Sequence, residues 1–309
     1  MSSRSITTGR TSGLLTLAIG ALFYSSGSIA RPDLQPLGPN IADKGSAFYR
    51  FTQRQYDSAD GERHYRVWTA VPDKAPPAAG YPVLYMLDGN AVMDKLDDAF
   101  LQQLFAGSPP VIVAIGYQTA LPFDTAARAW DYTPPLKTHE PRAGKPALPP
   151  RKTGGNDAFR QLLTETMVPQ TEANLKIDPH QRAIWGHSYG GLFVLDAWRK
   201  ASPFGIYYSA SPSLGQALQS PLQASQSLDA VRFRGKSLYL LEGDGKARGE
   251  PSGHEASLEV LRQTQQQLAS KGLTVAFWRY PGLTHGQMFE VSLRSALLHL
   301  SGQAALAHQ

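Results

Sequence analysis

The pattern of apolar and polar positions along the chain has two periods, one typical of strands and one typical of helices. Eight short runs rich in β-branched and aromatic residues predict strands. These runs cover residues 48–56, 64–71, 82–87, 110–117, 182–185, 206–211, 237–243 and 274–281. The first two alternate polar and apolar side chains, as half-exposed antiparallel strands do, whereas the later ones are more continuously apolar. Helical patterns lie between the later strands, at 92–105, 157–173, 190–200, 255–270 and 287–301.

Strands that alternate with helices predict an α/β fold: a mostly parallel sheet of eight strands with helices on both faces. The 309 residues, of which 42% are hydrophobic and 18% charged, have the composition of a globular protein. We find no internal repeat and expect one domain over residues 31–309. Because the chain has no cysteine, disulfides, thiolate metal sites and thiol nucleophiles are excluded.

The first thirty residues have the features of an export signal. Arg4 and Arg10 precede an apolar run of 12 residues, "GLLTLAIGALFY", and the small residues "SSGSIA" end at Ala30. We predict a signal peptide over residues 1–30 and a periplasmic protein; the alternative is an uncleaved anchor, although about 20 apolar residues normally span a bilayer. Cleavage lowers the formal net charge from +5 to +3, which suits an anionic ligand. No basic stripe for nucleic acid is present.

Residues 133–156 interrupt the alternation of strands and helices. This segment contains six prolines and five lysines or arginines but a single acid. So much proline excludes a helix or an inner strand. A long loop in a compact domain is either a lid or binding loop, or a solvated insertion. We therefore predict a proline-rich basic lid over 133–156, with the solvated loop as its alternative.

A G-x-S-x-G motif stands where a predicted strand meets a predicted helix. In "RAIWGHSYGG", Ser188 lies between Gly186 and Gly190. A serine on so sharp a turn projects its hydroxyl from the edge of a sheet, as a nucleophile elbow requires. A side chain at Gly186 or Gly190 is expected to collide with neighbouring backbone, and Gly191 to let the helix pack close to the sheet. The pattern predicts Ser188 as a nucleophile.

A serine hydroxyl needs a neighbouring base to be nucleophilic at neutral pH. Of the eight histidines, His285 stands in "PGLTHGQMF", just after the last predicted strand, where a loop can bring its ring over the carboxyl edge of the sheet. His187 lies inside the elbow, and its side chain is expected to point elsewhere. The order serine then histidine also fits hydrolases on such sheets, so His285 is the predicted base.

The third catalytic group has several candidates. The strand at 237–243 carries Glu242 near its end and is followed by Asp244, Glu250 and Glu255. Asp244 lies between two glycines on a turn that can face the histidine, so it is the predicted acid. Glu242 is open to a structural pairing. The alternative to a triad is a Ser–His dyad whose ring is oriented by a backbone carbonyl.

Two backbone N–H groups are needed where the attacked carbonyl oxygen gains negative charge. We expect one from Tyr189, the residue after the nucleophile. The other is expected from Asn90 in "YMLDGNAVM", where Gly89 lets the chain turn after a strand. Asp88 is expected to bond the backbone of that turn. Since no phosphate loop, His-x-x-x-His pair or carboxylate cluster appears, the sequence implies no metal and no cofactor.

Four segments in order resemble the putative-esterase branch of the α/β-hydrolases, which includes esterase D and the siderophore esterases. They read "YPVLYMLDGNAVM", "RAWDYTPP", "GHSYGGLFVLDAW" and "YPGLTHGQMF", and the resemblance extends over residues 46–300. It implies the α/β-hydrolase fold, Ser188 as nucleophile and His285 as base. It also implies that Arg128 faces the substrate; the alternative is a salt bridge to Asp131 or Asp124. Many relatives carry a glutamate where this chain has Lys246, a departure that favours the dyad.

With its export signal, the chain looks most like the periplasmic esterases that open the trilactones enterobactin and salmochelin. A ferric catecholate siderophore is a trianion with aromatic faces, which suits cations and aromatic side chains. The candidate substrate-binding residues are Arg128, Arg151, Lys152 and Trp198, with Arg142, Lys145 and Trp130 as further candidates. The alternatives are an exported serine esterase for another acyl or polysaccharide ester, and a non-catalytic binding protein on a hydrolase scaffold.

Overall fold

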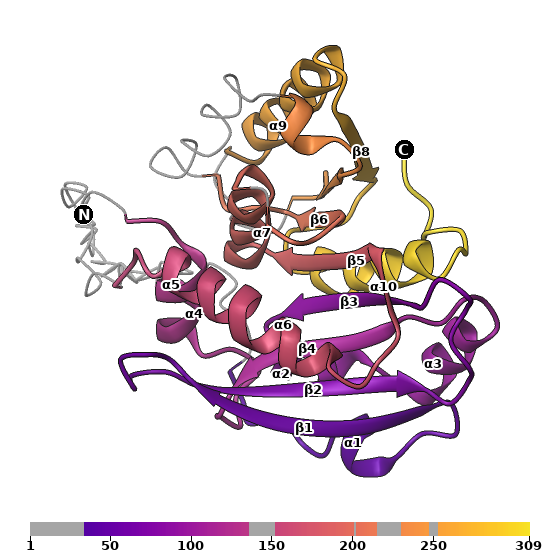
Figure 1. Ribbon diagram of the computed structural model, residues 1–309. Coiled ribbons are helices and arrows are strands. Elements are labelled where there is room, and N and C mark those ends of the chain that lie inside the picture. Colours follow the sequence, from indigo (N-terminus) through magenta and orange to yellow (C-terminus); the bar gives the residue numbers. More distant parts are fainter. Residues whose placement is uncertain (1–33, 136–151, 201, 215–229, 247–252) are drawn as a thin grey trace, which may run out of the picture.

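The computed structural model describes residues 34–135, 152–200, 202–214, 230–246 and 253–309 (Figure 1). The strands are β1 (Tyr49–Asp57), β2 (His64–Pro72), β3 (Tyr81–Leu87), β4 (Val111–Tyr117), β5 (Ile177–His187), β6 (Ile206–Ala210), β7 (Ser237–Gly243) and β8 (Thr274–Tyr280). They form one sheet in the order β1-β2-β4-β3-β5-β6-β7-β8. β2 pairs antiparallel with β1 and β4, and all later pairings are parallel. The mostly parallel eight-stranded sheet predicted from the sequence is confirmed.

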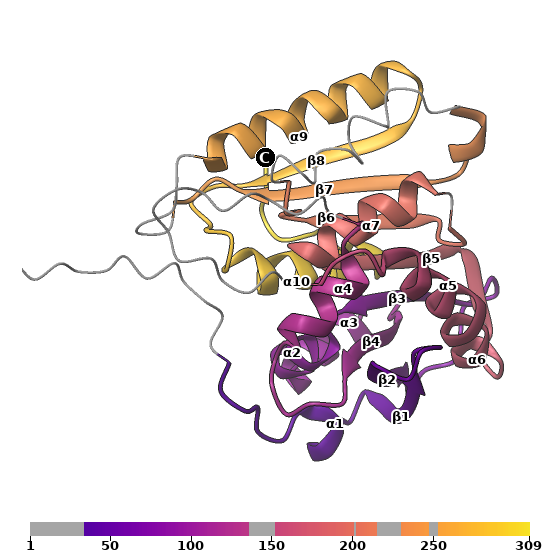
Figure 2. The same cartoon turned by 90° about the vertical axis from the view of Figure 1, so that its left-hand side faces the viewer.

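Helices cover both faces of this sheet (Figures 1 and 2). One face carries α4 (Thr125–Tyr132), α5 (Asn156–Leu162), a π-helical turn (Leu163–Met167), α6 (Val168–Glu172), α7 (Tyr189–Arg199), a 3-10 turn (Ala230–Phe233) and α9 (Gly253–Ser270). The other face carries α1 (Ile41–Lys44), α2 (Gly89–Lys95), α3 (Asp98–Phe105) and α10 (Met288–Leu300).

The central strands separate two hydrophobic cores because their side chains alternate between the two faces. In β3, Val83 and Tyr85 pack on the α7 side, whereas Leu84 and Met86 pack on the α10 side. Every residue of β3 and β4 is buried, as expected for strands covered on both faces. The carboxyl ends of the parallel strands therefore meet at one edge, where a site on such a sheet forms.

The helices differ from the sequence prediction in several places, and the short helix α1 was not predicted. The pattern at 92–105 forms two helices, because the side chain of Asp97 caps α3 by accepting the Phe100 N–H. No helix was predicted for α4, which begins after Asp124; the Asp124 side chain accepts the N–H groups of Ala126 and Ala127. This helix matters for function because it crosses the carboxyl edge of β3.

Part of the predicted organisation lies outside the described residues, namely the signal peptide over 1–30 and positions 136–151 of the basic segment. The two ends of that segment are described and lie together. The N–H of Gly154 donates to the carbonyl of Thr133, and that of Gly155 to the carbonyl of Trp130. Within the part of the chain that the structure describes, no helix is long and apolar enough to cross a membrane.

Candidate active site

Ser188 forms a one-residue turn between the end of β5 and the start of α7. Its backbone has φ 61° and ψ −116°, a left-handed conformation that a residue with a side chain adopts at a cost. The other non-glycine residues with left-handed φ in the described chain are Asp88, at 56°, and Ser211, at 38°. They follow β3 and β6, the neighbours of β5. Strained backbone is thus concentrated at the edge of the sheet where the sequence places the chemistry.

The glycines around Ser188 explain how the chain can turn there. A Cβ atom on Gly186 would lie 2.4 Å from the carbonyl oxygen of Gly190, and one on Gly191 would lie 2.6 Å from that of Ala210. Both predictions for these glycines are confirmed. The prediction for Gly190 is wrong, because a Cβ there would meet only the side chains of Leu87 and Asp88, at 3.5 Å and beyond, in ordinary contact.

The loop after β6 holds the nucleophile from both sides. The N–H of Ser188 donates to the Ala210 carbonyl over 3.0 Å, and the Ser188 carbonyl accepts the N–H of Ser213 over 3.2 Å. The hydroxyl oxygens of Ser188 and Ser213 are also 3.0 Å apart, within hydrogen-bond distance. Sequence reasoning missed Ser213. The pairing of β6 with β5 could have indicated it, since residues after β6 must then lie beside residues after β5.

The two predicted oxyanion-hole groups lie at helix starts. The N–H groups of Asn90 and Tyr189 belong to the first turns of α2 and α7, where a helix leaves its donors without an acceptor. Neither donates a backbone hydrogen bond within the described residues. The helix starts adjoin, because a Cβ on Gly190 would lie 3.7 Å from the Asp88 carboxylate. Both donors are therefore available at the edge that bears Ser188.

The side chain of Asn90 has a separate, structural role. Its Nδ2 donates to the carbonyls of Tyr117 and Thr119, and its Oδ1 accepts the Tyr117 N–H. These three bonds fasten the start of α2 to the end of β4. A substrate oxygen can therefore be met by the backbone of Asn90 rather than by its amide.

Arg128 is held by Asp88, which corrects the predicted salt bridge to Asp131 or Asp124. Its Nε and Nη2 donate to the two Asp88 carboxylate oxygens, each over 2.8 Å, and Nη2 also lies 3.4 Å from the His187 carbonyl. The Arg128 side chain is only 12% exposed. Its guanidinium also lies over the ring of Tyr189, 5.5 Å from the centroid. Arg128 therefore braces the elbow at the wall of the site, and its contact with substrate stays a prediction.

The two aspartates suggested as partners of Arg128 are engaged elsewhere. Asp131 accepts the hydroxyls of Tyr65 and Tyr117 over 2.9 Å and pairs with Arg63, while Asp124 caps α4. Burial raises the pKa of Asp131 to about 7, against the hydrogen bonds and the arginine that favour its charge. Spacings of three and four residues place Arg128 on the same side of α4 as these aspartates. Their other partners, and not the helical spacing, therefore explain why Arg128 pairs with Asp88.

The loop between β8 and α10 brings His285 to the elbow. The Nε2 atom of His187 lies 2.8 Å from the carbonyl oxygen of His285, and the two ring centroids are 4.7 Å apart. Burial, followed by the proximity of His285, lowers the pKa of His187 well below its usual value. His187 is therefore neutral at neutral pH, and His285, which is half-buried beside it, stays the predicted base for Ser188.

Asp244 does not contact the ring of His285. Its carboxylate bonds Arg279, with Nε at 2.6 Å, and accepts the N–H of Gly282 over 2.5 Å. Both partners lower the pKa of Asp244, the Gly282 bond more strongly. The prediction of Asp244 as the catalytic acid is thus corrected. Its carboxylate instead holds the backbone of the loop that carries His285. β8 pairs in register with β7, which places Arg279 beside the end of β7.

The remaining substrate-binding candidates lie in three different environments. Trp198 is 3% exposed and packs against Phe233, with ring centroids 4.6 Å apart, so its predicted contact with substrate is wrong. It lies nine residues along α7 from Tyr189, about 14 Å at the usual helical rise. Lys152 is exposed on the surface. Arg151 lies outside the described residues, as do Arg142 and Lys145.

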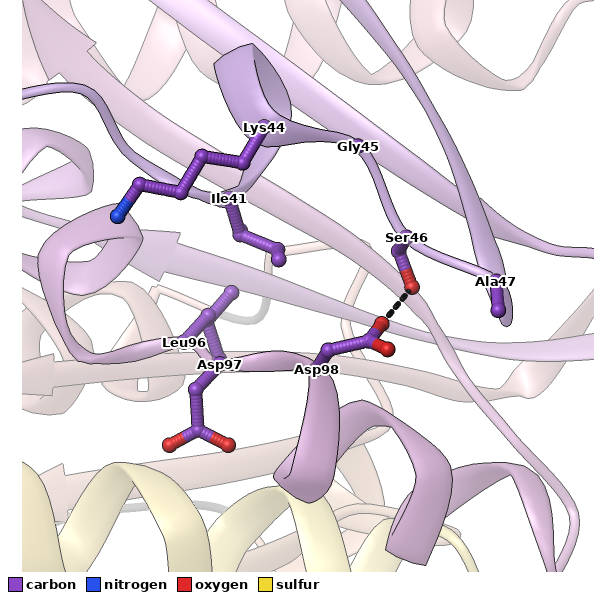
Figure 3. A pocket seen from close by; sticks show the side chains of 8 residues that line it. All are labelled: Ile41, Lys44, Gly45, Ser46, Ala47, Leu96, Asp97 and Asp98. Carbon is purple, nitrogen blue, oxygen red and sulfur yellow. Dashed lines mark hydrogen bonds between the residues drawn. The ribbon is translucent and has the colours of Figure 1, made fainter.

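A pocket of about 680 Å³ lies away from these residues (Figure 3). It is formed by the end of α1, the segment after it and the turn between α2 and α3, with Lys44, Asp97 and Asp98 among its side chains. Asp98 accepts the hydroxyl of Ser46, and Asp97 pairs with Arg294. None of the candidate catalytic residues lines this pocket. The described residues also include no cluster of three or more potential metal ligands.

Comparison with known proteins agrees with this geometry. The model of the family described as "Putative esterase" matches residues 58–300, most of the chain. The chain belongs to the putative esterase family. This esterase is 50% identical to the apo-salmochelin esterase of Escherichia coli O6:H1 (strain CFT073) over 292 residues, 94% of this chain and 90% of the relative. It is 36% identical to the ferri-bacillibactin esterase BesA of Bacillus subtilis (strain 168) over 268 residues, 81% of this chain and 90% of the relative.

A solved structure of the enterobactin hydrolase IroE in complex with DFP matches with a TM-score of 0.76 and 50% identity. The match covers 86% of this esterase and all of the IroE chain. The α/β-hydrolase fold and the serine-hydrolase chemistry predicted from the sequence are thereby confirmed.

This arrangement can carry out acyl transfer to water. In the proposed reaction, the Oγ atom of Ser188 attacks an ester carbonyl while His285 takes its proton. The N–H groups of Asn90 and Tyr189 meet the oxygen that gains charge, at the positive ends of two helices. The alcohol leaves with the proton from His285. Water then attacks the acyl-serine while His285 takes its proton, and the return of that proton to Ser188 Oγ releases the carboxylic acid.

Replacement of Gly190 or Gly191 by alanine should change the free energy of unfolding in different directions. In Gly191→Ala the new Cβ meets the Ala210 carbonyl, and we expect the free energy of unfolding to fall by about 1–3 kcal/mol. In Gly190→Ala the Cβ has room and alanine is the better helix former, so the free energy should stay equal or rise by up to about 1 kcal/mol. Urea unfolding followed by the fluorescence of the five tryptophans measures both. Greater destabilisation by Gly190→Ala would contradict this account of the turn.

Removal of Arg128 should be costly because it leaves the Asp88 carboxylate buried without its cation. We expect Arg128→Met to lower the free energy of unfolding by about 3–5 kcal/mol. The double variant with Asp88→Asn should recover part of that loss, since neither charge is then buried alone. Arg262→Met, which breaks an exposed pair with Glu259, is the control and should leave the urea midpoint unchanged. Equal midpoints for Arg128→Met and the control would show that the buried pair contributes nothing.

Proposed function

We propose that this esterase hydrolyses the ester bonds of a trilactone catecholate siderophore. The observation that carries the proposal is the identity of 50%, over 94% of the chain, to a relative named as an apo-salmochelin esterase. The relative from Bacillus subtilis and the matched structure of IroE are likewise named for siderophores. The site supports the same chemistry, because it combines a strained serine, a histidine loop and two helix starts at one edge of the sheet.

The first cleavage of the trilactone opens the ring that carries the chelating arms, and later cleavages shorten the linear product. Ser188 takes the acyl group of one ester, and the alkoxy oxygen leaves as an alcohol after it receives the proton held by His285. Water then releases the acyl group as a carboxylic acid. The first turnover converts the ring into a linear trimer, and later turnovers give smaller fragments. Because the catecholate arms are then no longer joined in one ring, the iron complex is weakened.

The ferric complex is the proposed substrate as well as the free siderophore. Its three negative charges need cations, and the guanidinium of Arg128 is already neutralised by Asp88. The excess of positive charge lies in the segment 133–156, with five lysines or arginines and one acid. Lys152, at the described end of that segment, is exposed. Long-range attraction by these cations should therefore raise the rate of association with the ferric form and weaken at high salt.

Chromatography of enterobactin, free and iron-loaded, tests the proposed substrate. The wild type should give the linear trimer and smaller fragments, and Ser188→Ala should lower the rate by about four orders of magnitude or more. A simple aryl ester is assayed in parallel. If the aryl ester is cleaved while both forms of enterobactin stay intact, the serine chemistry holds and the substrate is wrong. The ratio of the rates on the two forms shows which of them is preferred.

We also propose that the esterase works in the periplasm after removal of residues 1–30. The basic start, the short apolar run and the small residues that end at Ala30 support this. The full chain, produced in a Gram-negative host, should appear in the periplasmic fraction with a mass that corresponds to a start at Arg31. A full-length mass in the membrane fraction would favour the uncleaved anchor, and either form in the cytosol would contradict export.

A further inference from the structure

The loop that carries His285 has little burial of its own to fix it. Pro281, Gly282, Gly286 and Gln287 are exposed. Segments with few buried contacts are the ones that move most easily. A base whose ring shifts by about 1 Å can lose a hundredfold in rate, so this loop must be held from outside.

Two of the contacts that hold this loop come from β7 and its turn. Asp244 accepts the Gly282 N–H over 2.5 Å, and the Gly245 N–H donates to the Leu283 carbonyl over 2.9 Å. Both bonds act near the beginning of the loop, two or three residues before the base. They fix the loop to β7 but do not connect it to the nucleophile.

The bond from His187 is different because it reaches His285 itself. A carbonyl oxygen can only accept, so the 2.8 Å contact requires that Nε2 of His187 carries a hydrogen. His187 is 6% exposed, and the ring of Phe289 stands edge-on to it at 5.5 Å. Phe289 in turn meets Trp185 at 5.3 Å. The imidazole of His187 is thus clamped between α10 and the base, on the α10 face of β5.

We propose that His187 is a positioning residue for the catalytic base: its Nε2–H, donated to the His285 carbonyl, fixes the base relative to the nucleophile. Because His187 is bonded covalently to Ser188, the connection from the nucleophile to the backbone of the base runs through one side chain. The donor acts on the main chain of residue 285 and therefore sets the position of the ring, not its basicity. This inference rests on the acyl-transfer chemistry proposed for Ser188 and His285, and not on the siderophore as substrate.

Two substitutions at His187 separate positioning from packing. His187→Leu removes the donor and keeps an apolar side chain, while His187→Gln keeps a donor at a similar distance from the backbone. On a simple aryl ester, we expect His187→Leu to lower kcat by about a hundredfold with KM changed less than about threefold. His187→Gln should recover at least about tenfold of the lost kcat. The rate at which a fluorophosphonate labels Ser188 should fall and recover in the same order, since that reaction needs the same base.

The matched control is His299→Leu. His299 also makes one partly buried hydrogen bond, with its Nδ1 2.7 Å from the hydroxyl oxygen of Tyr208, but it lies within α10 and away from the elbow. The variant His299→Leu should lower the urea midpoint, as His187→Leu does. Its kcat should stay within about twofold of the wild-type value. Equal kcat for the glutamine and leucine variants, or an equal loss in His299→Leu, would overturn the proposal.

If His187→Leu does not fold, His187→Met provides the same loss of the donor. Wild-type cleavage of the aryl ester without cleavage of enterobactin refutes only the substrate.

Discussion

The left-handed turn at Ser188 is the constraint on which the rest of the site depends. A non-glycine residue in that conformation costs about 1–3 kcal/mol, so the surrounding structure has to impose it. The chain does so by omitting side chains at Gly186 and Gly191, where a Cβ would meet backbone oxygens. It adds backbone hydrogen bonds from the loop after β6 on both sides of the serine. The nucleophile is therefore positioned by the pairing of β5 with β6 and not by its own helix alone.

The other parts of the site are tied to this same turn. The buried pair of Asp88 and Arg128 joins the start of α2 to α4, and a further bond from Arg128 reaches the His187 carbonyl. Both oxyanion donors thus sit on backbone that is fixed to the elbow. The histidine loop is fastened at Gly282 by Asp244 and at His285 by His187. The bonds of Arg128 and His187 reach the end of β5, whereas the bond of Asp244 joins the histidine loop to β7, so the site is held together through the ends of several strands.

Features that depend on a short stretch of sequence could be predicted, whereas contacts between distant segments could not. The strands appear as apolar runs, and the elbow needs only the ten residues of "RAIWGHSYGG", so both were predictable. The partner of Arg128 was not, because Asp88 lies 40 residues away and meets it only after α4 crosses β3. Asp244 looked like an acid facing the histidine because two glycines flank it. Its actual partner, Arg279, lies on the next strand, in a register that periodicity does not give. Trp198 belongs to the apolar face of α7, a pattern that already indicated the core.

The burial of His187 has an electrostatic consequence for the base. When His285 takes the proton of Ser188 it becomes a cation, with its ring 4.7 Å from that of His187. A second positive charge at that distance would oppose the proton transfer by about 3–4 kcal/mol at an effective dielectric constant near 20. Because burial lowers the pKa of His187, this ring stays neutral and can donate from Nε2 without opposing the charge on His285. The charge of the nearby Arg128 is likewise matched by that of Asp88, so neither side chain opposes the positive charge that the base gains during the reaction.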